Sequence, residues 1–184
     1  MDLMKAVVVY RSVYGSTKKY AEWIAEKIGC KALDRDSAEY SEIEGADIII
    51  YGGGLYAGKV NGIEFLTSSP QRFKDKKIVL FTCGLADPAD AENHKNIMSG
   101  IRKAVPECLL ERAEIFCLRG GIDYSRLGFI HRTMMAMMYK AVKKKGVSAE
   151  GKEFIESYGK AVDFTDKEAI EPIVEYVLKC MGTD

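Results

Sequence analysis

Hydroxyl side chains gather in one short stretch, Ser12-Val13-Tyr14-Gly15-Ser16-Thr17, which follows the apolar run Ala6–Tyr10. Helical spacing of apolar residues then begins at Ala21, so the stretch lies between an expected strand and an expected helix. The first amides of a helix lack backbone partners and carry partial positive charge, which suits them to an anion. Gly15 would allow the backbone to approach that anion closely. The stretch therefore predicts a phosphate-binding turn, with a simple hydroxyl-rich helix cap as the alternative.

A second stretch, Gly52–Ala57, matches the pattern G-x-G-x-x-[GA]. A dinucleotide-binding fingerprint should open a helix near the first strand, whereas this stretch follows the later apolar run Asp47–Tyr51 and continues through more glycines. We interpret it as a flexible loop that ends the strand at Gly52–Gly54. Leu55 and Tyr56 could then lie against a flat ring, and a plain glycine-rich turn is the alternative. The nucleoside-triphosphate pattern G-x-x-x-x-G-K-[ST] does not occur.

A third stretch, Thr82–Asp87, follows the apolar run Ile78–Thr82, and its amides could meet the polar edge of a ring. Cys83 has no histidine beside it, so we interpret it as a small residue at a strand end rather than a nucleophile. His94 and His131 lie far apart without a ligand pattern around them. We therefore predict no metal site and name no catalytic residue.

The surrounding elements are expected to alternate between strands and helices. The apolar runs that predict strands are Ala6–Tyr10, Cys30–Leu33, Asp47–Tyr51, Ile78–Thr82 and Glu114–Leu118. Helices are expected over residues 21–28, 63–66, 88–105, 127–141 and 166–181, with Gly29 closing the first. Pro172 lies either in the first turn of the last helix or after a separate turn.

This alternation predicts a single α/β domain over residues 1–184, a three-layer sandwich whose doubly wound five-stranded parallel sheet carries helices on both faces. Ligands of such sheets sit outside the carboxyl ends of the strands. The loops at 11–17, 52–61, 83–90 and 119–126 all follow strands. Their convergence at one edge is the main functional expectation.

Bulk composition limits the class of protein. The chain has 184 residues, of which 47% are apolar, and 27 basic residues balance 27 acidic ones. A general nucleic-acid binder would be basic, so no nucleic-acid partner is expected. The five cysteines are widely spaced without a C-x-x-C, which favours a reducing, cytoplasmic compartment over a disulfide framework. Neither a signal-peptide pattern nor a membrane-spanning apolar run is found.

The segment 127–145 has an unusual composition, with four methionines followed by lysines. Its apolar residues at helical spacing are Leu127, Ile130, Met134, Met138 and Ala141. A core helix with a solvated lysine tail explains this pattern, and so does a helix that rests on an anionic membrane. A peripheral contact with the inner face of the membrane through 119–145 therefore stays open.

The chain resembles the flavodoxin superfamily over essentially its whole length. The first stretch looks like the flavodoxin phosphate loop for FMN, and the second and third look like the two loops that flank the flavin ring. The resemblance implies strand order 2-1-3-4-5 and one FMN bound without a covalent bond. The residues it implies at the cofactor are Ser12, Tyr14, Gly15, Ser16 and Thr17 for the phosphate; Gly53, Gly54, Leu55, Tyr56, Ala57 and Gly58 beside the ring; and Thr82, Cys83, Gly84, Leu85 and Asp87 at its other side or the ribityl chain.

Within the superfamily the C-terminal third resembles the menaquinone-dependent protoporphyrinogen dehydrogenase branch. The segment RGGIDYSRLGFIHRTMMAMMYKAVKKKG looks like that branch's extra segment, and GKEFIESYGKAVDFTD is similar to the stretch before its last helix. This implies an FMN enzyme that passes electrons from a porphyrinogen-like or other reduced substrate to a quinone. Lys59, Tyr124 and Arg126 are candidates to shape the substrate entrance.

Other functions are compatible with the same residues. A diffusible flavodoxin-type electron carrier would dock on protein partners, and flavodoxins that do so are typically acidic. This chain is neutral and its segment 119–145 is basic, which favours the enzyme. A flavodoxin-like binding module without flavin is the remaining alternative, and the intact hydroxyl stretch speaks against it.

Overall fold

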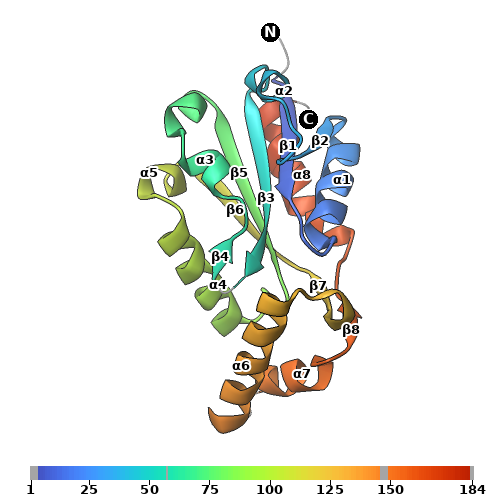
Figure 1. Cartoon of the computed structure of the whole chain (residues 1–184). Coiled ribbons are helices and arrows are strands. Elements are labelled where there is room, and N and C mark those ends of the chain that lie inside the picture. The colour runs from blue at the N-terminus through green and yellow to red at the C-terminus, as the bar shows by residue number, and fades with distance from the viewer. Residues whose placement is uncertain (1–3, 57, 146–148, 183–184) are drawn as a thin grey trace. The chain divides into compact units, whose positions relative to one another are not determined.

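The computed structural model describes residues 4–56, 58–145 and 149–182 (Figure 1). These residues form two compact units. The first contains the chain up to Gly120 and again from Thr165, and the second contains Gly121–Phe164. The first unit carries all three glycine- and hydroxyl-rich stretches of the sequence.

A parallel sheet forms the centre of the first unit. Its strands are β1 (Ala6–Arg11), β2 (Lys31–Asp34), β3 (Ile48–Tyr56), β5 (Lys77–Gly84) and β6 (Ala113–Arg119), and they lie in the order β2-β1-β3-β5-β6. Counted as five parallel strands this is the order 2-1-3-4-5, so the predicted topology is confirmed. The short β4 (Lys59–Val60) pairs with the end of β3 in the antiparallel direction.

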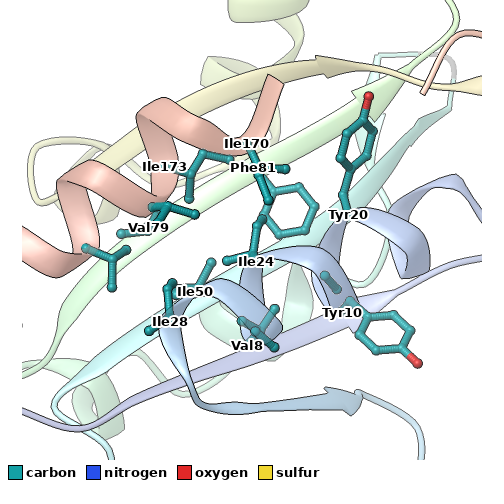
Figure 2. Packing of buried hydrophobic residues seen from close by; sticks show 14 of the residues in the cluster. Val8, Tyr10, Tyr20, Ile24, Ile28, Ile50, Val79, Phe81, Ile170 and Ile173 are labelled. Atoms are coloured by element: carbon teal, nitrogen blue, oxygen red, sulfur yellow. The ribbon is translucent and has the colours of Figure 1, made fainter. Parts of the chain in front are cut away.

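Helices cover both faces of this sheet, as predicted. Successive strand residues point to opposite faces, so Val8, Ile50 and Phe81 share one face, against α1 (Ser16–Ile28) and α8 (Glu171–Met181) (Figure 2). Side chains of the opposite parity face α4 (Ala91–Ala104). Because both faces are covered, the strand centres are uninterrupted runs of Val and Ile without alternation. Each fully buried aliphatic side chain stabilises the fold by about 1.5–3 kcal/mol.

The smaller elements of the first unit were only partly expected. They are α2 (Tyr40–Glu44), α3 (Glu64–Thr67), η1 (Pro70–Phe73), α5 (Glu107–Leu110) and η3 (Glu168–Ile170). Of these, α3 confirms the helix expected over residues 63–66, whereas α2 and α5 were not predicted. Pro172 lies in the first turn of α8, which directly follows the separate turn η3.

Helix ends follow the local chemistry. Gly29 ends α1 in the left-handed conformation, and its amide donates to the Ala25 carbonyl, as its position in the sequence predicted. The fourth helix begins at Ala91 and not at Pro88, so that predicted start is wrong. Asp90 explains the difference, because its carboxylate accepts hydrogen bonds from two backbone amides of the first turn at 2.9 Å.

Strand β3 runs through the glycine-rich stretch to Tyr56, so the prediction of a flexible loop that begins at Gly52 is wrong. Gly52 pairs with Tyr10 on one side and with Phe81 on the other. A Cβ added to Gly52 would lie 2.1 Å from Cζ of Phe81. Glycine is therefore required inside this strand because the Phe81 ring lies across it. The stretch does not open a helix, which excludes the dinucleotide fingerprint.

The second unit is built around a small group of aromatic side chains. Its elements are β7 (Gly121–Asp123), η2 (Tyr124–Arg126), α6 (Phe129–Lys145), α7 (Ala149–Ser157) and β8 (Ala161–Asp163), with β7 and β8 antiparallel. Tyr139 of α6 stacks on Tyr158, with ring centroids 4.2 Å apart. Tyr124 and Phe154 meet the same Tyr158 ring edge to face.

Helix α6 confirms the helix expected over residues 127–141, but its buried face differs from the predicted one. Ile130 is 78% exposed and Met138 is 49% exposed, whereas Met135 is buried. Met135 and Tyr139 are four residues apart and lie on one face, so the stacking of Tyr139 on Tyr158 turns that face inward. Among the described residues, no helix is both long enough and apolar enough to cross a membrane.

Candidate functional site

The turn between β1 and α1 holds the first predicted stretch together. Gly15 precedes the first helical residue with φ +100°, a conformation that only glycine adopts readily. The Ser12 hydroxyl oxygen accepts a hydrogen bond from the Gly15 amide at 3.1 Å, which leaves the hydroxyl proton for another acceptor. A Cβ added to Gly15 would meet no atom within 4 Å, so the turn is open on that side.

Helix α1 gives this turn its electrostatic character. It has 13 residues, and no side chain at Gly15 caps its first amides because glycine has none. Ser16 and Thr17 are its first two residues, and Thr17 is buried. A helix start with an open approach and neighbouring hydroxyls suits a phosphate group. The turn thus brings together all of the residues predicted at the phosphate.

The end of β3 packs onto this turn through Tyr56. A Cβ added to Gly54 would lie 2.8 Å from the Tyr56 hydroxyl oxygen, so the ring lies directly over Gly54. Burial raises the pKa of Tyr56 to about 12, Cys83 and Tyr14 add to the shift, and a hydrogen bond from the Val13 amide opposes it.

The rest of the second stretch is strand and hairpin. Gly53 lies in β3 opposite Arg11 and Thr82, and Gly58 forms the turn to β4 with φ +74°. Ala57 lies outside the described residues. Gly58 therefore closes a tight hairpin and does not belong to a long flexible loop.

The third stretch begins inside a strand and not after it. Thr82, Cys83 and Gly84 are the last residues of β5. Thr82 is 1% exposed and its side chain bonds to the Cys117 thiol, while Cys83 is buried. A Cβ added to Gly84 would lie 3.5 Å from Cβ of Leu55, so the second and third predicted stretches meet there.

Gly120 joins the first and third stretches. A Cβ added to Gly120 would lie 2.7 Å from the Cys83 sulfur and 3.2 Å from Cβ of Ser16. The Gly120 amide also donates to the Gly84 carbonyl at 2.6 Å. A side chain at Gly120 would therefore force the ends of β5 and α1 apart. Sequence reasoning gave Gly120 no role. The signal that could have found it is the pair Gly120-Gly121 just after β6, because glycine allows a close approach of the backbone.

Arg119 was also given no individual role, and the structure places it beside the third stretch. Its Nε donates to the Leu85 carbonyl at 3.3 Å, and its Nη1 lies 3.5 Å from the Asp87 carboxylate. The Tyr20 hydroxyl donates to the Arg119 carbonyl at 2.7 Å and accepts from the Asp166 amide at 3.0 Å. The backbone and the side chain of Arg119 are thus both held in place.

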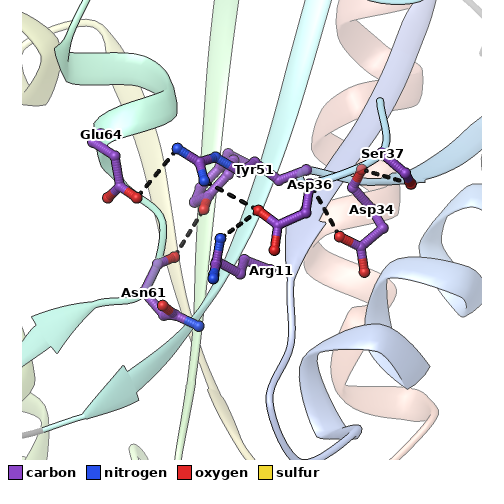
Figure 3. Close-up of polar contacts among 8 residues, drawn as sticks. Arg11, Asp34, Asp36, Ser37, Tyr51, Asn61 and Glu64 are labelled. Carbon is purple, nitrogen blue, oxygen red and sulfur yellow. Dashed lines mark hydrogen bonds and ion pairs between the residues drawn. The ribbon is translucent and has the colours of Figure 1, made fainter. Parts of the chain in front are cut away.

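A network of charged residues borders the site at the end of β1 (Figure 3). Arg11 pairs with Asp36, and Asp36 also accepts from Arg35 at 3.1 Å. Arg35 continues to Glu64 of α3 at 3.2 Å. The network connects β1, the residues after β2 and α3. Because each of these charges has an opposite partner, the network is explained as a structural brace.

Tyr51 supports the residues that follow β4. Its hydroxyl donates to the Asn61 carbonyl at 2.8 Å, and burial raises its pKa well above the ordinary range. Gly62 has φ +72°, and a Cβ there would lie 2.3 Å from the Tyr51 hydroxyl oxygen and 2.8 Å from Cδ of Arg11. Together these contacts fix the chain between β4 and α3.

The candidates for a substrate entrance are divided between the two units. Lys59 lies in β4 of the first unit and is exposed, whereas Tyr124 and Arg126 belong to the second unit. Tyr124 is buried there, and Arg126 is exposed. Within the described ranges, no group of three His, Cys, Asp or Glu side chains could hold a metal ion.

Comparisons with known proteins agree with this fold. The model of the Flavodoxin domain family matches residues 7–148. An uncharacterized protein from Methanocaldococcus jannaschii is 27% identical over 122 residues, which are 66% of this chain and 79% of that protein. The family match includes the β1–α1 turn and the ends of β3 and β5, which carry all of the stretches predicted at the cofactor.

Two solved proteins are similar to this chain at low sequence identity. A flavodoxin, WrbA-like protein from Agrobacterium tumefaciens is 21% identical, with 77% of this chain and 98% of that one covered and a TM-score of 0.43. The two-electron reduced flavodoxin from Megasphaera elsdenii is 15% identical, with 61% and 82% covered and a TM-score of 0.42.

Proposed function

Because the chain belongs to the Flavodoxin domain family, we propose that it binds one FMN without a covalent bond and acts as an FMN-dependent oxidoreductase. One observation carries the proposal: the three predicted stretches meet at the carboxyl edge of the sheet. Gly120 lies against both Ser16 and Cys83, and Gly84 lies against Leu55. This edge is where doubly wound sheets bind their ligands.

The residues at this edge fit the chemistry of FMN. A phosphate needs a helix start with hydroxyls and an open approach, which the turn at Ser12–Thr17 supplies. Leu55 and Tyr56 offer apolar and aromatic surface for a flat ring, and backbone amides near Leu85 and Asp87 offer donors for its polar edge. FMN itself supplies the electron chemistry, and the protein binds, orients and tunes it.

The electron donor and acceptor are the finer part of the proposal. We propose a reduced organic substrate, porphyrinogen-like or of another class, as the donor and a quinone as the acceptor. The resemblance of Arg119–Gly146 to the extra segment of the menaquinone-dependent branch supports this choice of donor and acceptor, and so does the neutral net charge. The fold by itself does not decide the reaction.

A diffusible electron carrier is the second candidate. The observation that favours it is a set of exposed apolar side chains on α6, with Phe129 85%, Ile130 78% and Met137 62% exposed. Exposed apolar side chains of this size are typical of surfaces that dock on a partner. Lys140 and Lys143 on the same helix make an anionic membrane surface an alternative partner.

The first experiment is the visible absorption spectrum of the purified chain, followed by identification of any flavin released on heating. We expect the two visible bands of an oxidised flavin, and FMN in the supernatant. A colourless protein that also fails to take up added FMN would overturn the proposal for enzyme and carrier alike.

Site-directed variants test whether FMN binds at the β1–α1 turn. Replacing Ser12, Ser16 and Thr17 together with Ala should abolish tight FMN binding and leave the circular dichroism spectrum unchanged. The matched control replaces the exposed hydroxyls of Ser37, Ser41 and Ser68 with Ala, and should bind FMN as the native chain does. Unchanged binding by the first variant would contradict the role of the turn.

Turnover separates the two candidates. An enzyme should reduce a soluble quinone analogue in repeated cycles when a porphyrinogen or another small reductant is supplied. A carrier should exchange electrons rapidly with a redox protein and slowly with small molecules. Sedimentation with vesicles that contain phosphatidylserine tests the membrane alternative. The native chain is compared in this assay with a variant that carries Phe129→Ser, Ile130→Ser and Met137→Ser together.

A further inference from the structure

Arg119 is a cation fixed next to the predicted ring-binding stretch. It is the last residue of β6 and lies opposite Gly84 in the register of the sheet. Its side chain is 21% exposed, and its Nε and Nη1 reach the Leu85 carbonyl and the Asp87 carboxylate at 3.3 and 3.5 Å. Withdrawing a guanidinium from water has a cost, which two such partners offset.

The backbone of Arg119 is anchored equally firmly. Its carbonyl accepts from the buried Tyr20 hydroxyl at 2.7 Å, and the next amide, that of Gly120, donates to Gly84 at 2.6 Å. Gly120 in turn lies against Ser16 and Cys83. The positive charge is therefore held at the place where the predicted cofactor stretches converge.

A charge in this position acts on the reduction of a flavin. At neutral pH an oxidised flavin ring is uncharged, and uptake of two electrons and one proton gives a reduced ring with one negative charge. A fixed cation beside the ring stabilises the reduced form more than the oxidised form, and a fixed anion has the opposite effect. The protein supplies such charges, and the electrons come from the donor.

We propose that Arg119 is the positioning residue that raises the reduction potential of the bound flavin, and that its partner Asp87 lowers it. This inference rests on the proposed FMN site. Two effects follow from the one ion pair: Arg119 orients the stretch Leu85–Asp87 by hydrogen bonding, and the balance of the two charges sets how strongly the site favours reduced over oxidised FMN.

The test compares the potential of bound FMN in the native chain, Arg119→Gln, Asp87→Asn and Arg119→Lys. The protein with FMN is reduced by dithionite in the presence of a reference dye, and the dissociation constant of oxidised FMN is measured separately. Arg119→Gln should weaken the preference for reduced over oxidised FMN about tenfold. For a two-electron couple this corresponds to a reduction potential that is about 30 mV more negative. Asp87→Asn should shift the potential in the positive direction, and Arg119→Lys should retain most of the native value.

Shifts of the reduction potential in opposite directions in Arg119→Gln and Asp87→Asn distinguish an effect of charge from an effect on the structure of the loop. If Arg119 and Asp87 only hold the loop, both neutral variants should weaken the binding of FMN and leave the potential unchanged or shifted in the same direction, which overturns the inference. Arg102→Gln is the matched control, because Arg102 is exposed in the last turn of α4, which returns the chain to the opposite edge of the sheet. Absence of FMN binding by the native chain would overturn the proposed function and this inference with it.

Discussion

Tyr14 and Tyr56 meet edge to face, with ring centroids 6.1 Å apart and ring planes at 79°. The contact joins the β1–α1 turn to the end of β3, and the Val13 amide bonds to the Tyr56 hydroxyl at the same place. Aromatic pairs of this geometry contribute about 0.5–1.5 kcal/mol beyond the burial of their surface. The pair therefore holds two of the predicted cofactor stretches together.

The raised pKa of Tyr56 predicts a loss of stability in alkali. Burial raises that pKa to about 12, whereas an unfolded tyrosine titrates near about 10. The unfolded chain therefore loses this proton first, so the stabilisation that Tyr56 provides below about pH 10 is lost as the pH rises towards 12. In urea unfolding, the native chain should lose about 1–2 kcal/mol more than Tyr56→Phe over this range. Parallel losses in the two proteins would contradict a buried Tyr56 hydroxyl.

Gly52→Ala should disrupt the centre of the sheet. The new methyl group would lie 2.1 Å from Cζ of Phe81, and overpacking of this kind costs about 3 kcal/mol or more. Thermal unfolding should show a large fall in Tm, and the second change Phe81→Leu should restore part of it. Gly45→Ala is the control, because Gly45 has φ −77° and a Cβ there would meet no atom within 4 Å. A Gly52→Ala protein as stable as this control would show that β3 and β5 are not packed as described.

Tyr20→Phe should lower stability through its hydroxyl alone. The Tyr20 hydroxyl donates to the Arg119 carbonyl and accepts from the Asp166 amide, and Tyr20 is fully buried. Without the hydroxyl both backbone groups lose a partner, at a cost of about 1–3 kcal/mol. Chemical denaturation measures the loss against Tyr40→Phe, whose ring is 46% exposed. Equal stability of the two variants would mean that the Tyr20 bridge contributes nothing.

Asp90→Ala should destabilise α4 from its first turn. The Asp90 carboxylate accepts from the amides of Glu92 and Asn93 at 2.9 Å, and loss of such a cap costs about 1 kcal/mol. The midpoint of urea unfolding should fall accordingly. Asp75→Ala provides the comparison, since the side chain of Asp75 is 85% exposed. If helix α4 began at Pro88, the two variants would behave alike.

The strands were predictable where burial on both faces dictates the residue types. Runs such as Val7–Val9 and Ile48–Ile50 leave few alternatives to a covered parallel sheet. The continuation of β3 through its glycines was not predictable, because glycine has low strand propensity and the reason for it lies on another strand, at Phe81. Tertiary packing overrides local preference at this point.

The predicted cofactor residues were recognisable as stretches after strands, but their mutual contacts were not. That Gly120 would lie against Ser16 and Cys83 depends on the register of the four strands β1, β3, β5 and β6, which no local pattern contains. The buried face of α6 was missed for a related reason. With methionines at four neighbouring positions the helix is apolar on several sides, and the stacking of Tyr139 on Tyr158 selects among them.

Pairing of β7 with β8 places Gly121 beside Asp163, so the chain enters and leaves the second unit through adjacent residues. A segment whose ends already lie together can be lengthened, shortened or exchanged without pulling apart the elements that it interrupts. The residues between these two strands can therefore be replaced as one segment without a change in the sequence of the first unit. A change within this segment leaves the sequence of the three predicted cofactor stretches unaltered, because all three belong to the first unit.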